Sequence, residues 1–123
     1  MRKIKLGIFG LSRGTESLEV IQYCGADIVA ICDKREEALK KTSEALKNTP
    51  TCYTDFDKFI EHEGLEAVLL ANYFHEHAPY AIRCLEKGIH VLSECASNGT
   101  MAEGVALVRA AEKSNAIYML AEN

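Results

Sequence analysis

The chain has 123 residues, of which 48% are hydrophobic and 26% are charged, and its formal net charge is -4. This composition supplies the core of one soluble globular domain and excludes a disordered chain. The negative balance, without a cluster of Lys and Arg, argues against nucleic acid or an anionic membrane as a partner.

The N-terminal segment, residues 3–16, has the pattern of a strand, a tight turn and the start of a helix. In a dinucleotide-binding fold such a turn presents backbone N–H groups and a helix N-terminus to a pyrophosphate. Compared with G-x-G-x-x-G, the run Gly10-Leu11-Ser12-Arg13-Gly14-Thr15 has serine and threonine at the second and third glycine positions. An ordinary strand-to-helix turn therefore stays open as the alternative.

Short apolar runs then alternate with helical patterns along the chain. Further strands are expected at 27–32, 51–53, 67–71, 89–93 and 117–121, and helices at 18–24, 38–46, 54–62, 77–87 and 100–111. Thr54 with Asp57, and Thr100 with Glu103, resemble capping pairs. With right-handed crossovers this order predicts an α/β fold, a doubly wound parallel sheet of six strands in the order 3-2-1-4-5-6.

Ligands bind such a sheet at the carboxyl ends of its strands, here 10–15, 33, 72–77, 94–95 and 122–123. Asp33 closes the second strand about twenty residues after the glycine turn, where an acidic side chain accepts hydrogen bonds from the adenosine ribose. A helix N-cap is the alternative role for this aspartate. The turn and the acid together favour a dinucleotide site.

Six segments of the chain share a pattern with a known family, in the right order: residues 9–11, 29–33, 53–56, 77–81, 85–94 and 100–103. Together they resemble the N-terminal NAD(P)-binding Rossmann domain of Gfo/Idh/MocA oxidoreductases, and the resemblance covers nearly the whole chain. It implies NAD, or less favourably NADP, as cofactor and a sugar, inositol or similar polyol as substrate. It also implies that residues 1–123 form the dinucleotide-binding domain and that a second, mostly β-sheet substrate domain would begin where this chain ends.

The resemblance also implies the site residues. The cofactor-binding positions fall on Gly10, Leu11, Ser12, Arg13, Asp33, Asn72, His77 and Glu94. The family's E-K-P segment falls on Glu94-Cys95-Ala96, so the lysine that assists proton transfer is missing. The thiol of Cys95 can exchange a proton in principle but lacks the charge that would stabilise an alkoxide. A small core-side residue at a strand end is the alternative role for Cys95.

The loop after the fourth expected strand also departs from the family, whose T-P reads Asn72-Tyr73 here. Tyr73 and Phe74 either flank a nicotinamide or plug the site, and the residues leave both open. His75-Glu76-His77 suggests a metal site, since alternate residues of an extended segment point the same way. No third ligand follows at a recognised spacing, so we predict no metal.

Cysteine usage and hydropathy indicate the compartment. The five cysteines are widely spaced and lack a C-x-x-C pair, which argues against a disulfide framework or a zinc ribbon. No uncharged stretch approaches ~18 residues and Lys5 interrupts the first apolar run, so we expect neither a membrane span nor a signal peptide. These features predict a reduced, cytoplasmic protein.

Two function classes follow. The first is the cofactor-binding half of a nicotinamide-dependent oxidoreductase, which we expect to be inactive alone because it lacks the lysine and the second domain. The second is a non-catalytic nucleotide-binding or interaction module that has lost the chemistry. In either case the face that would pack on the missing domain is expected to be exposed, which predicts a homo-oligomer such as a dimer.

We expect NAD to bind in preference to NADP. A 2'-phosphate about 4 Å from the Asp33 carboxylate costs up to ~4 kcal/mol per unit charge at an effective dielectric near 20. Lys34 and Arg35 are expected at the exposed start of a helix, where ion pairs contribute only about 0–1 kcal/mol. Ser12 and Thr15 place side chains where the motif has glycines, which leaves open whether the pyrophosphate can approach the turn closely.

Overall fold

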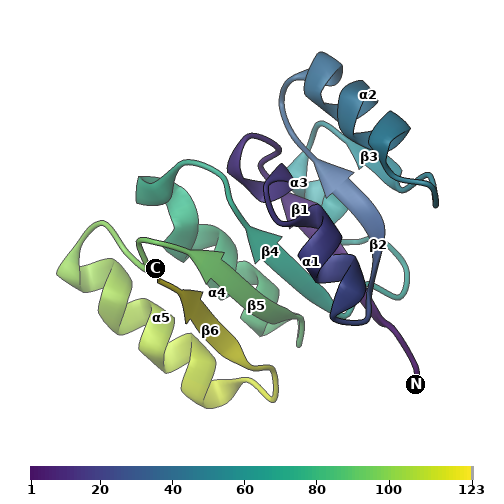
Figure 1. Cartoon of the computed structure of the whole chain (residues 1–123). Helices are drawn as coiled ribbons and strands as arrows, with labels where there is room; N and C mark the ends of the chain where they lie inside the picture. Colours follow the sequence, from purple (N-terminus) through teal and green to yellow (C-terminus); the bar gives the residue numbers. More distant parts are fainter. Residues whose placement is uncertain (123) are drawn as a thin grey trace.

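A six-stranded parallel sheet forms the centre of the protein, as the computed structural model of residues 1–122 shows (Figure 1). Asn123, which we expected at the edge of the cleft, lies outside the described residues. The strands follow the order β3-β2-β1-β4-β5-β6, and every neighbouring pair is parallel. The predicted fold class and strand order are confirmed.

Strands and helices alternate along the chain. The strands are β1 (Ile4–Phe9), β2 (Ala26–Cys32), β3 (Thr51–Tyr53), β4 (Ala67–Leu70), β5 (His90–Glu94) and β6 (Tyr118–Ala121). The helices are α1 (Leu18–Tyr23), α2 (Glu36–Ala45), α3 (Phe56–Phe59), α4 (His77–Glu86) and α5 (Met101–Lys113), with 3-10 turns η1 (Arg13–Thr15) and η2 (Phe74–Glu76). The predicted bounds of β2 to β6 differ from these by at most one residue.

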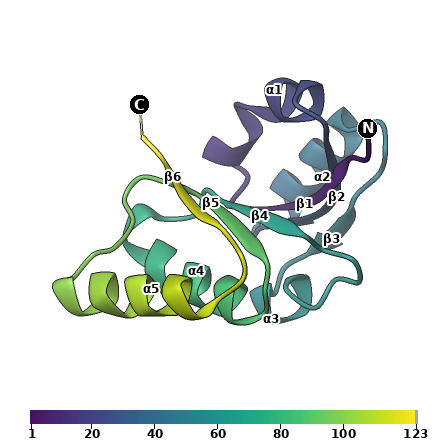
Figure 2. The same ribbon diagram turned by 90° about the horizontal axis from the view of Figure 1, so that it is seen from below.

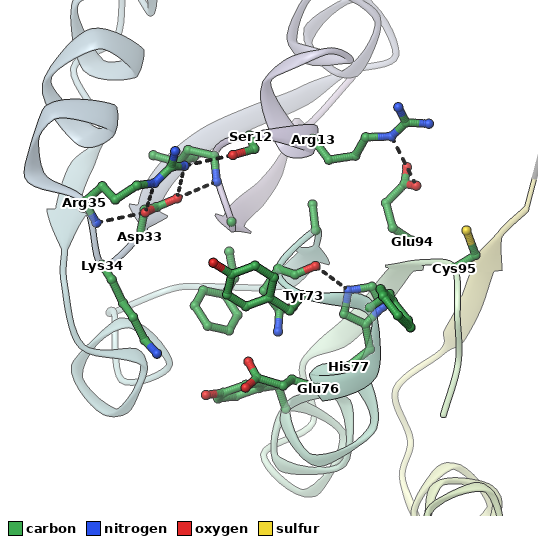
Figure 3. A pocket seen from close by; sticks show the side chains of 17 residues that line it. Ser12, Arg13, Asp33, Lys34, Arg35, Tyr73, Glu76, His77, Glu94 and Cys95 are labelled. Atoms are coloured by element: carbon green, nitrogen blue, oxygen red, sulfur yellow. Dashed lines mark hydrogen bonds and ion pairs between the residues drawn. The ribbon is translucent and has the colours of Figure 1, made fainter. Parts of the chain in front are cut away.

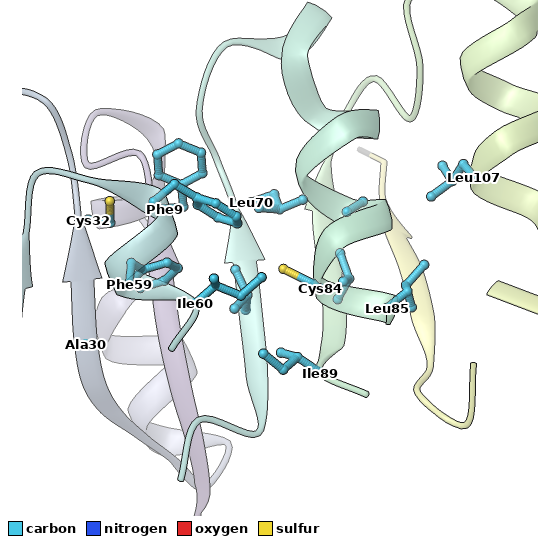
Figure 4. Close-up of a cluster of buried hydrophobic side chains, with 14 residues drawn as sticks. Phe9, Ala30, Cys32, Phe59, Ile60, Leu70, Cys84, Leu85, Ile89 and Leu107 are labelled. Atoms are coloured by element: carbon cyan, nitrogen blue, oxygen red, sulfur yellow. The ribbon is translucent and has the colours of Figure 1, made fainter. Parts of the chain in front are cut away.

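The helices cover the two faces of the sheet. Figure 2 shows α3, α4 and α5 on one face and α1 and α2 on the other. Side chains along β1 point alternately to the two faces of the sheet and so contribute to both hydrophobic cores. Leu6 and Ile8 join the core under α2, while Phe9 joins the core under α3 and α4. Figure 4 shows the second of these clusters, with Phe59 and Cys84 packed beneath their helices.

Helix α3 is shorter than expected and has a different cap. The sequence placed Thr54 at its N-cap and its end near His62. In the structure Asp55 is the N-cap, and its carboxylate accepts a hydrogen bond from the Asp57 N–H at 2.9 Å. Aspartate caps helices at least as well as threonine, so the helix begins one residue later. After Phe59 the chain continues in tighter turns, with His62 N–H donating to the Phe59 carbonyl.

The cap of α5 is confirmed. Thr100 Oγ1 accepts from the Glu103 N–H at 3.1 Å, and Glu103 Oε2 accepts from the Gly99 N–H at 3.4 Å. Among residues 1–122, no helix has the length and apolar character needed to cross a membrane.

Candidate cofactor-binding site

A cleft of about 520 Å³ opens at the carboxyl ends of β1, β2, β4 and β5. Its walls come from four loops far apart in the sequence, at 9–13, 33–35, 71–80 and 94–95 (Figure 3). Parallel strands end at the same edge of the sheet, which is why these loops meet. All eight residues proposed from the sequence as cofactor-binding, and Cys95 beside them, line this cleft.

The glycine turn forms the floor of the cleft. Gly10 has φ +94°, and a Cβ placed on it would lie 2.5 Å from backbone atoms of Ala71 and Asn72. Its N–H donates to the Cys32 carbonyl at 2.9 Å. Only glycine accepts this conformation and this close approach of two loops. The first glycine of the predicted motif is therefore required by the packing of β1 against β4.

The sequence predicted that the turn leads directly into a helix, but in the structure it does not. Residues 13–15 form the 3-10 turn η1, and α1 begins only at Leu18 and has six residues. Thr15 contributes to this, because its hydroxyl donates to the Ser12 carbonyl at 3.0 Å and lies 3.3 Å from the Leu11 carbonyl. A threonine hydroxyl that binds the preceding backbone competes with a regular helix start.

Asp33 is already engaged by protein groups. Within residues 1–122 its Oδ1 accepts from the backbone N–H and Nε of Arg35 at 2.9 and 3.0 Å. Its Oδ2 accepts from the Leu11 N–H at 2.8 Å and from Arg35 Nη2 at 3.0 Å. Figure 3 shows this arrangement, in which Arg35 Nη2 also donates to Ser12 Oγ at 3.0 Å. Asp33 therefore joins the loops after β1 and β2.

Asp33 and Arg35 each stabilise the charged form of the other. Burial by itself raises the pKa of the Asp33 carboxyl, but the hydrogen bonds from Arg35 and Leu11 outweigh it and hold that pKa below its usual value. The hydrogen bonds to Asp33 raise the pKa of the Arg35 guanidinium. Arg35 lies at the exposed start of α2, as expected, and there it is paired with a carboxylate whose side chain is only 9% exposed.

Asn72 is the residue in the cleft with the least satisfied side chain. Its amide nitrogen and oxygen are both buried, and neither has a hydrogen-bond partner among the described residues. An unpaired buried amide costs about 1–3 kcal/mol, so a bound group that completes its hydrogen bonds would be favoured. A dinucleotide offers the donors and acceptors that this side chain lacks, so the residues present fit such a ligand.

His77 joins two loops and is almost fully buried. Its two ring nitrogens lie 3.0 Å from the carbonyl oxygens of Ala96 and Asn72, and Ser93 Oγ lies 3.3 Å from Nδ1. The segment before it forms η2, so the alternation on which a paired-histidine metal site depended does not apply. Within residues 1–122 no three metal-ligating side chains cluster.

Arg13, Glu94 and Cys95 lie at the far side of the cleft from Asp33 (Figure 3). Arg13 Nε is 3.9 Å from Glu94 Oε2, and its Nη1 is 3.1 Å from Glu16 Oε2. Cys95 is exposed, so the alternative of a core-side residue at this position is wrong. The thiol is open to the cleft and to reagents.

Three aromatic residues and one arginine line the cleft beside the eight residues proposed to bind the cofactor. Tyr73 and Phe74 are about two-thirds exposed, and Figure 3 places the Tyr73 ring in the middle of the cleft. Tyr80 lines the same wall one helical turn after His77, a spacing that could have predicted it. Arg35 follows Asp33 by two residues. This short spacing between an acid and an arginine is the sequence signal that could have predicted their ion pair.

A model of the oxidoreductase family with an NAD-binding Rossmann fold, GFO_IDH_MocA, matches residues 4–122. The alpha-N-acetylgalactosaminidase of Bacteroides fragilis is 31% identical over 98% of this chain and 30% of its own length. The glycosyl hydrolase family 109 protein 1 of a Shewanella strain is 28% identical over the whole chain and 29% of its own length. The chain thus spans about a third of the length of these curated relatives.

Solved structures share the fold at lower identity. The myo-inositol 2-dehydrogenase of Lactobacillus plantarum superposes with a TM-score of 0.89 at 21% identity, covering 98% of this chain and 36% of that one. The WlbA dehydrogenase of Bordetella pertussis, solved with NADH and UDP-GlcNAcA, gives a TM-score of 0.88 at 24% identity over 98% and 35% of the two chains.

Proposed function

We propose that this chain, which belongs to the Gfo/Idh/MocA oxidoreductase family, is the NAD-binding Rossmann domain of an enzyme that oxidises or reduces a hydroxyl of a sugar, inositol or similar polyol. The cleft carries this proposal, because it joins a glycine turn closed on the β4 loop with the buried Asn72 amide, which has no hydrogen-bond partner within residues 1–122. The inositol and sugar dehydrogenases that share the fold support this substrate class.

We assign the cofactor contacts by position in the cleft. The turn from Gly10 to Arg13 would face the pyrophosphate, with backbone N–H groups and one guanidinium as donors. Asp33 lies at the adenosine end, while Asn72 and Glu94 lie toward the nicotinamide end, where His77 holds the two loops. NAD, when bound, supplies the hydride acceptor, and these residues bind and orient it.

The substrate site is proposed to lie largely outside residues 1–123. The chain spans about a third of the length of its curated relatives, which supports a second domain that completes the site. Within the cleft, Cys95 stands where the resemblance implies the family's proton-transferring lysine, and a thiol lacks the cationic charge of lysine. This substitution favours a second candidate, a nucleotide-binding module without catalysis.

Calorimetric titration with NAD, NADH and ADP-ribose tests the cofactor assignment. We expect binding to the wild-type chain and about tenfold weaker binding in Arg13→Ala, because one charge-assisted contact to the pyrophosphate is lost. Arg109→Ala, which removes an exposed arginine on α5 away from the cleft, is the matched control and should bind normally. No binding at millimolar ligand would refute the assignment.

We also propose that the protein is a homo-oligomer. Met101, Val105 and Val108 on α5 and Met119 on β6 are exposed apolar side chains. Figure 2 shows α5 and β6 together at the edge of the sheet remote from α2. Apolar patches of this kind tend to be covered by a partner. Light scattering at high concentration should report a dimer or larger species, and a clean monomer would count against this proposal.

A cytoplasmic location is proposed from the cysteines. All five lie among the described residues, and each is a free thiol. Free thiols persist in a reducing compartment. Fractionation of cells that express the chain should recover it with cytoplasmic marker proteins, and recovery from an oxidising compartment would contradict the proposal.

A further inference from the structure

We propose that Arg35 lowers the discrimination of this domain against NADP(H), by neutralising Asp33 and offering its guanidinium to a 2'-phosphate. The inference rests on the proposed function, since it requires a dinucleotide in the cleft. From the sequence, Lys34 and Arg35 were expected to offset the charge of Asp33 only weakly, whereas in the structure Arg35 is bonded to that carboxylate.

The acceptor sites of Asp33 are filled. A carboxylate has about four lone-pair sites, and here the Leu11 N–H and three groups of Arg35 occupy them. A ribose hydroxyl can then donate to Asp33 only if an Arg35 contact is displaced. An acidic residue at this position usually favours NAD by accepting a hydrogen bond from the 2'-hydroxyl of its adenosine ribose. That contact is blocked while Asp33 is bonded to Arg35.

The charge that would repel a phosphate is also balanced. The Arg35 guanidinium binds both carboxylate oxygens of Asp33 at 3.0 Å, so the pair presents no net charge to the cleft. The Asp33 side chain is nearly buried whereas that of Arg35 is 58% exposed. A ligand at the adenosine end therefore meets the Arg35 cation rather than the Asp33 carboxylate.

Arg35 keeps unused donors on that surface. Its Nε and Nη2 are engaged with Asp33 and Ser12, while Nη1 has no partner in the described part of the chain. A guanidinium presents two N–H donors at that nitrogen, in a plane suited to a phosphate. Ser12 Oγ accepts from Arg35, so its own proton stays free to bind a phosphate oxygen.

Titration calorimetry with NAD and NADP measures the ratio of the two dissociation constants. For the wild type we expect NADP to bind no more than about tenfold more weakly than NAD, because the local net charge is zero. In Arg35→Gln the ratio should rise at least about tenfold, since Asp33 then faces the phosphate unpaired. Lys41→Ala removes a cation from the exposed side of the same helix and should leave the ratio unchanged.

A second measurement on the wild-type chain covers the case in which Arg35→Gln does not fold. A 2'-phosphate held by Arg35 adds an ionic contact, so NADP affinity should fall more steeply with salt than NAD affinity. Equal salt slopes for NAD and NADP would overturn the inference about Arg35 but not the proposed function. The same holds if the ratio of the two dissociation constants in folded Arg35→Gln lies within about threefold of the wild-type ratio. Absence of binding by NAD, NADP and ADP-ribose would overturn it together with the proposed function.

Discussion

At Asp33 a single carboxylate joins two loops of the cleft and is itself held by an arginine two residues later. The local sequence predicted a free acid that contacts a ribose. The folded chain instead closes the pair before any ligand arrives. NAD stays the expected cofactor, and we infer from this pair that the penalty against NADP is smaller than an unpaired carboxylate would impose.

The lowered pKa of Asp33 predicts how stability depends on pH. Its pKa is lower in the folded chain than the value of about 3.9 in the unfolded chain, so its contribution is complete above about pH 5 and is lost as pH falls below 4. Asp33→Asn should therefore be destabilised by about 1–3 kcal/mol at pH 7 and should lose less stability than the wild type on acidification. Urea unfolding at pH 7 and at about pH 2.5, below the unfolded pKa, measures both, and parallel losses would contradict the assignment.

Thiol reactivity is the second prediction at this scale. Burial raises the pKa of Cys32 and of Cys84 to about 12, whereas Cys24, Cys52 and Cys95 are exposed. Iodoacetamide should label the exposed group at least about tenfold faster than the buried pair.

Saturating NAD should slow labelling at Cys95 only, because this thiol lines the cleft. Cys24 follows α1 away from the cleft and serves as the internal control. Peptide mass spectrometry reads each site separately. Equal labelling of Cys95 with and without NAD would show that the ligand does not reach the end of β5.

At the scale of elements, the turn after β1 decides whether the cleft forms. Gly10 combines a positive φ with contact against the β4 loop, while Gly25 has a similar φ of +92° with open space around it. The two glycines therefore separate the cost of backbone strain from the cost of a steric clash.

Gly10→Ala should destabilise the chain by about 2–4 kcal/mol and abolish NAD binding, because strain and clash act together. Gly25→Ala should cost only about 1 kcal/mol, from strain alone, and should bind NAD normally. Urea unfolding with parallel calorimetry measures both effects. Similar losses in the two variants would show that the close approach to Ala71 does not constrain the turn.

For the whole molecule, the sheet brings four loops together into one cleft, and we propose that the substrate site lies largely outside it. We expect residues 1–123 with NAD and a panel of inositols and sugars to give no NADH above background, since the resemblance implies that Cys95 takes the place of the family's lysine. Absorbance of NADH over hours is the measurement. Turnover that disappears in Cys95→Ala would reverse this expectation and make the thiol catalytic.

The sequence by itself determined the elements and their order. Strands and helices follow from hydrophobic periodicity, from caps such as Thr100 and from stops such as Gly25 and Gly88, all of which are local signals. Parallel topology then follows from alternation and handedness, and it places every strand end at one edge. This is why the eight residues proposed to bind the cofactor all line the cleft.

Only the tertiary structure decided what those residues do within the cleft. The Asp33 contacts with Leu11, the two carbonyls around His77 and the unpaired amide of Asn72 depend on loops that meet only after the sheet forms. Hydrogen bonds act over about 3 Å, and no local pattern specifies which distant groups come within that range. The residue types in the site were therefore readable from the sequence, whereas their partners, charges and exposure were set by packing.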